Sequence, residues 1–263
     1  MVPTHTNAAL REDAVRQLPR ASTLPGVDPE GLPRGRIRAR RHRVRPATWM
    51  LTTCAAISGL LLAAFVLVHM VGNLKVYQGP EAFNAYAQWL RVAGAPLLPG
   101  GALLWGFRLT LLLTGLVHIW STLVLRLRAA RARGSHRARQ RVALGRWMLP
   151  SGMVLLIFVI LHILDLTTGT VNPDFTPANA GTSFAYQNLL ASFSMPLFAT
   201  VYILAMVALG VHLTHGLGAA ATSLGVRGTR TRAIWMQASR LLGVGIALVN
   251  ISIPLAVQWG LIV

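Results

Sequence analysis

The chain has 263 residues, of which 54% are hydrophobic and only 12% are charged, whereas a soluble domain normally carries about 25% charged residues. Its 25 Lys and Arg residues against 7 Asp and Glu give a net charge of +18. In a soluble protein that excess would suggest nucleic acid binding, but the positions of the charges indicate a membrane protein and no nucleic acid partner. The single cysteine, Cys54, excludes an internal disulfide and an iron–sulfur cluster, which needs about four thiolates.

The first 46 residues are rich in Arg, Pro and Gly and show no sustained apolar period. This composition predicts a flexible basic tail over residues 1–46, followed by one membrane domain over residues 47–263. A signal peptide begins with a short basic region and has a short apolar core. Because a long polar stretch comes first here and the apolar run after it is long, we expect no cleavage.

Five apolar segments follow the tail, and each is near or above the roughly 20 residues that a helix needs to span the hydrocarbon core. A transmembrane barrel would need alternating segments of about 10 residues, and that pattern is absent. The sequence therefore predicts an all-α integral membrane protein with a bundle of five transmembrane helices, over residues 48–73, 102–125, 147–168, 194–222 and 240–263.

The basic residues predict the orientation of these spans. Of the 25 Lys and Arg residues, 22 lie in the tail or around the second and fourth connections, and only Lys75, Arg91 and Arg108 lie on the other side. Positive residues stay in the cytoplasm, so we expect a cytoplasmic N-terminus and an outside C-terminus. The same charges could bind anionic lipid headgroups or an acidic partner.

Five of the eight histidines lie in the apolar spans: His69, His118, His162, His212 and His215. An ionisable ring in lipid is costly without partners and is a functional hypothesis by default. One isolated ring could equally well bond a neighbouring helix. Four successive helices that each carry a histidine favour a shared function.

Depth places these histidines in two level pairs. His118 and His212 each lie 16 residues after the expected outer ends of their helices, Ala102 and Pro196, which is about 24 Å along the helix. His69 and His162 lie toward the outer ends of theirs, with a rougher match. Two histidines that face each other across a bundle at one depth form an axial cage for a b-type haem iron.

The spacings also indicate an internal repeat, in which the first two helices and the next two are equivalent halves. His69 and His162 are 93 residues apart, and His118 and His212 are 94 apart. The connections "FNAYAQWL" (residues 83–90) and "FAYQNLL" (residues 184–190) share aromatic and Asn character. In the fourth span, His212 gives the better depth match, and His215, about 60° away around the axis, stays as the alternative ligand.

Residues 48–263 resemble the five-helix, di-haem cytochrome b membrane subunit of succinate:quinone oxidoreductases, or succinate dehydrogenases. The resemblance depends on five motifs: "HMVGN" (69–73), "GPEAFNAYAQWLR" (79–91), "LVHIW" (116–120), "LHILD" (161–165) and "HLTHGLG" (212–218). It implies that His69 and His162 bind the iron of an outer haem b and that His118 and His212 bind an inner one. The family places the fourth ligand four residues before a Gly, here Gly216. The Arg-rich tail departs from the family pattern.

The resemblance also implies the rest of respiratory complex II, in the bacterial cell membrane. A flavoprotein subunit with FAD would oxidise succinate, a step of the tricarboxylic acid cycle. An iron–sulfur subunit at the cytoplasmic face would pass the electrons to this anchor, for transport to menaquinone or ubiquinone. This chain would contribute no catalytic residue for succinate, and whether the complex forms a higher oligomer stays open.

Several polar residues are candidates for quinone, protons or haem propionates, and solvated loop positions or helix ends are the alternative explanation for each. Asp165, one turn after His162, could carry protons, bind quinone or cap its helix. The quinone and proton candidates are Asp165, Glu81 and Lys75; the propionate candidates are Lys75, Arg91, Arg126, Arg128 and Arg146. Two other functions stay open: the di-haem anchor of a formate dehydrogenase or hydrogenase, and a proton-coupled transporter.

Overall fold

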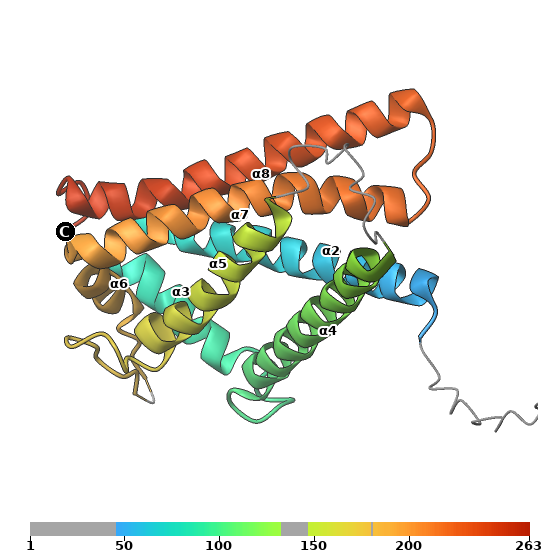
Figure 1. Ribbon diagram of the computed structural model, residues 1–263. Coiled ribbons are helices and arrows are strands. Elements are labelled where there is room, and N and C mark those ends of the chain that lie inside the picture. Colours follow the sequence, from blue (N-terminus) through green and yellow to red (C-terminus); the bar gives the residue numbers. More distant parts are fainter. Residues whose placement is uncertain (1–45, 133–146, 180) are drawn as a thin grey trace, which may run out of the picture. The chain divides into compact units, whose positions relative to one another are not determined.

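The computed structural model describes residues 46–132, 147–179 and 181–263, and these residues form helices and loops without any strand (Figure 1). All but the last residue of the expected basic tail, together with the candidate Arg146, therefore lie outside the described residues. The segment from Pro46 to Val263 forms one compact unit. The expected all-α fold is confirmed for the described part of the chain.

Within residues 46–132, 147–179 and 181–263, five helices are long and apolar enough to cross a membrane, in agreement with the predicted number of spans and with a multi-pass membrane protein. They are α2 (Thr48–Asn73), α4 (Ala102–Ala132), α5 (Met148–His162), α7 (Pro196–Ser223) and α8 (Thr229–Gln258). The 3-10 helix η2 (Leu74–Gln78) continues α2, and the π-helical turn η3 (Ile163–Thr167) continues α5. A π-helical turn within a helix is often found at a functional site.

The predicted bounds of the fifth span were wrong, because apolarity marks the part of a helix that sits in lipid and not the whole helix. The helix α8 begins at Thr229, so Arg240 lies within it and does not open it. It ends at Gln258, where the chain turns through Gly260 at a φ of 67°. At the end of α4, the segment "RLRAARA" likewise continues the helix beyond residue 125 to Ala132, because Arg, Leu and Ala are strong helix formers.

Two shorter helices, α3 (Pro80–Val92) and α6 (Ala185–Ser194), occupy the connections whose sequences resemble each other. The Asn84 side chain of α3 accepts a hydrogen bond from the Tyr186 backbone N–H at 2.9 Å and donates one to the Gln187 Oε1 atom at 3.0 Å. The Tyr186 hydroxyl in turn donates to the Val263 carbonyl at 3.0 Å. The two connections and the C-terminus therefore meet at one end of the bundle (Figure 1).

Small residues bring α7 and α8 into close backbone contact along much of their length (Figure 1). A Cβ atom added at Gly210 would lie 3.0 Å from the Ala247 Cβ, and one added at Gly243 would lie 2.6 Å from the Thr214 Oγ1. Helices in lipid associate through such small-residue faces because the lipid tails are as apolar as the side chains. The helix α8 thus packs closely along one side of α7.

The other four long helices pack in a chain: α4 against α2, α2 against α7, and α7 against α5. Neither α2 and α5 nor α4 and α7 form a packed interface with each other. Ser121 is the one buried residue of α4. The two pairs of helices that carry the expected histidine pairs are therefore held apart by their neighbours.

Candidate functional site

The rings of His118 in α4 and His212 in α7 meet across the bundle, with ring centres 6.4 Å apart and an angle of 69° between the ring planes. Because the two helices do not pack on each other, the rings approach each other through the space between the helices. Both α4 and α7 begin at the residues from which the depths of these histidines were counted. His215 has no ring contact with another histidine among the described residues, so the structure brings His212 to His118.

Serine hydroxyls on the neighbouring helices hold these two rings. The His118 Nδ1 lies 3.2 Å from both the Ser58 Oγ and the Ala55 carbonyl oxygen, and the His212 Nδ1 lies 3.2 Å from the Ser151 Oγ. Each serine donates its own hydrogen to the carbonyl four residues earlier, at 2.6 Å from Ser58 and 2.7 Å from Ser151. Each hydroxyl oxygen therefore accepts from Nδ1–H, which leaves Nε2 with the lone pair that a metal needs.

A glycine follows each of these serines and lets the ring lie close to the helix backbone. A Cβ atom at Gly59 would lie 3.1 Å from the His118 Cε1, and one at Gly152 would lie 3.3 Å from the His212 Cε1. The Ser58–Gly59 and Ser151–Gly152 dipeptides are 93 residues apart, the same separation as His69 and His162. Our sequence reasoning missed them, although the repeated Ser-Gly at this spacing was a usable signal.

His69 in α2 and His162 at the end of α5 form the other pair, with ring centres 5.9 Å apart and an interplanar angle of 83°. His69 stacks on Phe65 at 5.4 Å and makes no hydrogen bond with any described residue. The His162 Nδ1 lies 3.3 Å from the Tyr202 hydroxyl oxygen. One ring of this pair is thus held by a hydrogen bond and the other by packing alone.

The two pairs occupy two levels of the bundle. His69 lies 11 residues after Ser58 in α2, and His162 lies 11 residues after Ser151 in α5. Since Ser58 and Ser151 touch the rings of the other pair, the levels are separated by about 16 Å on both helices. The two pairs are therefore separated by the same number of residues on both helices.

The ring separations fit two imidazoles bound to one metal from opposite sides. Two metal–nitrogen bonds of about 2 Å, plus about 1 Å from each nitrogen to its ring centre, give about 6 Å between ring centres. The observed values are 5.9 and 6.4 Å. A planar group that supplies the remaining ligands would lie between helices that do not pack on each other. The residues present therefore fit a haem at each level.

Asp165 lies in η3 and is fully buried, with an exposed fraction of 0%. Its Oδ2 accepts hydrogen bonds from the Ser192 and Tyr202 hydroxyls, each at 2.7 Å, and its Oδ1 has no partner among the described residues. Asp165 is therefore an interior group linked to the His162 side of the site, and it does not cap a helix at the surface. The sequence did not identify Ser192 and Tyr202 as partners of Asp165, because they lie on segments far from it along the chain.

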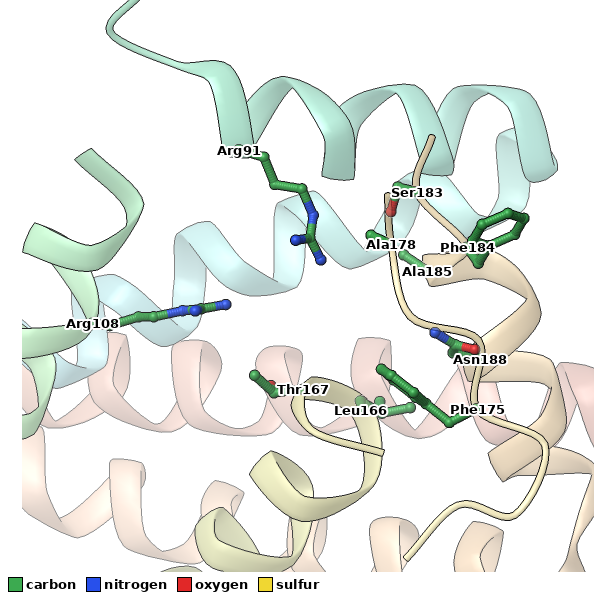
Figure 2. A pocket seen from close by; sticks show the side chains of 10 residues that line it. All are labelled: Arg91, Arg108, Leu166, Thr167, Phe175, Ala178, Ser183, Phe184, Ala185 and Asn188. Atoms are coloured by element: carbon green, nitrogen blue, oxygen red, sulfur yellow. The ribbon is translucent and has the colours of Figure 1, made fainter. Parts of the chain in front are cut away.

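Arg91 of α3 and Arg108 of α4 point into one pocket from two sides (Figure 2). Leu166 and Thr167, at the end of η3, lie on its wall, together with Phe175 from the loop that follows. The Arg108 guanidinium also lies 5.0 Å from the centre of the Trp105 ring. Arg108 was not among the candidate residues, although an arginine inside an apolar span is itself a functional signal.

The other predicted polar candidates do not gather around this pocket. The Lys75 ammonium lies 5.8 Å from the centre of the Tyr86 ring, and Glu81 is exposed in the first turn of α3. Arg126 is exposed on α4. Arg128 donates to the Pro46 carbonyl at 2.7 Å and to the Thr48 hydroxyl at 3.2 Å, so its guanidinium secures the start of α2.

Comparisons of the chain with protein-family models, with curated proteins and with solved structures found no match.

Proposed function

We propose that this chain is the di-haem cytochrome b membrane anchor of a succinate:quinone oxidoreductase, respiratory complex II, in a bacterial cell membrane. The observation that carries the proposal is the pair of facing histidines at each of two levels, with ring centres 5.9 and 6.4 Å apart on helices that do not pack together. The resemblance of the motifs around these histidines to the succinate dehydrogenase anchor supports the choice of partner enzyme.

In this proposal His69 and His162 hold the outer haem, and His118 and His212 hold the inner haem. The basic residues near the start of α2, the end of α4 and the start of α8 support a cytoplasmic position for those helix ends. The haems, when bound, supply one-electron transfer between an iron–sulfur subunit and membrane quinone. The chain's own contribution is to separate the helices and to present the Nε2 atoms of His118, His162 and His212, whose Nδ1 atoms are held by hydrogen bonds.

The Arg91–Arg108 pocket is the best-supported place for the carboxylates of the outer haem. An arginine inside a membrane span is costly unless it meets an anion, and two guanidinium groups aimed into one pocket suit paired carboxylates. Thr167 on the pocket wall lies five residues after His162, which places the pocket beside the same level. Arg128 is a weaker candidate because it already bonds the start of α2.

Lys75 and Glu81, beside the proposed outer haem, stay the quinone candidates to test, and a quinone site on the inner side stays the alternative. Both lie on the segment that directly follows His69, in η2 and in the first turn of α3. Asp165 is enclosed by side chains, so in this proposal it acts from the interior and does not touch quinone.

The decisive experiment purifies the protein with its native partners and measures the haem content per chain by reduced-minus-oxidised spectra. We expect two haems per chain. His69→Ala or His162→Ala should remove one haem, and His118→Ala or His212→Ala the other. His215→Ala is the matched control, because it removes a histidine of α7 that does not meet His118, and it should retain both haems.

The co-purifying subunits decide between enzymes. A subunit with covalently bound flavin and succinate-dependent quinone reduction would support complex II. A subunit with molybdenum or nickel would instead show the anchor of a formate dehydrogenase or hydrogenase. A purified protein without any haem band would refute the haem proposal and favour a proton-coupled transporter.

A further inference from the structure

A chain of hydrogen bonds runs from the His162 ring to a buried carboxyl group. The His162 Nδ1 lies 3.3 Å from the Tyr202 hydroxyl oxygen, and that hydroxyl donates to the Asp165 Oδ2 at 2.7 Å. Ser192 donates to the same oxygen at 2.7 Å. Asp165 and Ser192 are fully enclosed and Tyr202 is 6% exposed, so these three residues lie in the protein interior, whereas His162 is partly exposed.

The donors and acceptors of this chain have one consistent direction. The Tyr202 hydrogen is used toward Asp165, so the Tyr202 oxygen can only accept from the ring nitrogen of His162. His162 therefore carries its proton on Nδ1 and presents the Nε2 lone pair to a metal. The Asp165 Oδ1 has no partner among the described residues, so the hydrogen bonds of this carboxyl group all converge on Oδ2.

This support is specific to one of the four proposed ligands. His69 makes no hydrogen bond within the described residues, and His118 and His212 bond neutral hydroxyl or carbonyl oxygens. Only His162 is linked to an acidic group. Its position at the junction of α5 and η3 lets the π-helical turn bring Asp165, three residues later, under the Tyr202 hydroxyl.

We propose that Asp165 is a positioning residue that acts through Tyr202 on His162 and lowers the reduction potential of the outer haem. A ring N–H that donates toward an acidic group makes the other ring nitrogen a stronger electron donor. A stronger donor stabilises the more positive ferric state, which lowers the potential. Burial strengthens the effect, because hydrogen bonds are electrostatically stronger in a low dielectric. The inference rests on the proposed haem function and deepens it.

The test is a redox titration of both haems in the purified complex, for the native chain and for two variants of the relay, which is the hydrogen-bond chain from Asp165 through Tyr202 to His162. Tyr202→Phe removes the acceptor of the His162 N–H and keeps the ring. We expect about a tenfold larger ratio of reduced to oxidised outer haem at a given potential, a shift of about 59 mV for one electron. Asp165→Asn should shift the outer haem in the same direction by a smaller factor, because Asn still accepts from Tyr202 but lacks the acidic group.

Two internal controls separate this effect from general damage. The inner haem, about 16 Å away along the helices, should keep its potential in both variants. Tyr77→Phe also removes a tyrosine hydroxyl, one that lies 2.7 Å from the Ser252 hydroxyl, and it should change neither potential. A shift of both haems together would show a structural disturbance and would overturn the relay.

Variants that keep two haems at native potentials would overturn the relay and leave the proposed function intact. If Tyr202→Phe loses the outer haem, Asp165→Asn decides the question, since it preserves the shape of the site. An unchanged outer potential in that variant would overturn the proposal. A native chain that binds no haem would instead refute the proposed function itself, together with the relay.

Discussion

Gly59→Val tests the close packing of α2 against the His118 ring. A Cβ atom at position 59 would lie 3.1 Å from the His118 Cε1, whereas carbon atoms prefer a separation of about 3.5–4.0 Å. Alanine would therefore need a shift of a few tenths of an ångström, and the two methyl groups of valine would need roughly 1 Å. A displacement of that size is about half of a metal–imidazole bond of about 2 Å, so the inner haem should be lost.

The assay is the haem content of the purified complex, measured from the reduced-minus-oxidised spectrum. We expect the Gly59→Val complex to fall from two haems per chain to one, with the bands of the outer haem unchanged. Gly245→Val is the matched control, because a Cβ atom at Gly245 of α8 would meet no atom within 4 Å. A Gly59→Val complex that retains two haems with native spectra would refute the packing argument.

Three further predictions concern other parts of the structure. Arg108→Gln should weaken retention of the outer haem and spare the inner one, in a haem-loss assay in detergent; equal loss of both haems would contradict the pocket assignment. Arg128→Ala removes two hydrogen bonds to the start of α2 and should destabilise the fold by about 1–3 kcal/mol, seen as a lower thermal unfolding temperature with both haems present. Gly243→Leu should cost roughly 1–3 kcal/mol or more, because its Cβ atom would lie 2.9 Å from the Gly210 backbone oxygen; a native unfolding temperature would show that α7 and α8 are not tightly packed.

The spans were predictable because the requirement for about 20 apolar residues acts on each segment by itself. For the same reason the bounds of α8 were missed. The helix includes the basic segment that begins at Thr229, and a hydropathy pattern marks only the apolar part of a helix. The short helices α3 and α6 were missed as helices, although the likeness of their sequences was noted. Their contact through Asn84 joins residues about 100 positions apart.

The assignment of the four histidines as haem ligands stays a prediction, and the structure adds the geometry on which it can be tested. Counting along helices placed the rings at matching depths, but depth does not determine which way a ring points. In the structure the His69 ring meets the His162 ring and the His118 ring meets the His212 ring, although neither pair of helices forms a packed interface. The preference for His212 over His215 stays a prediction as well, and the contact between the His212 and His118 rings supports it.

By itself, the sequence determined the number of spans, their apolar extents and the presence of a histidine on each of four successive helices. These properties are local, since lipid acts on each segment separately. The tertiary structure alone decided which groups support the rings: Ser58 and Ser151 for one pair, and Tyr202 with Asp165 for the other. Such support depends on hydrogen bonds between helices that are far apart in the sequence, and these bonds form only when the helices pack.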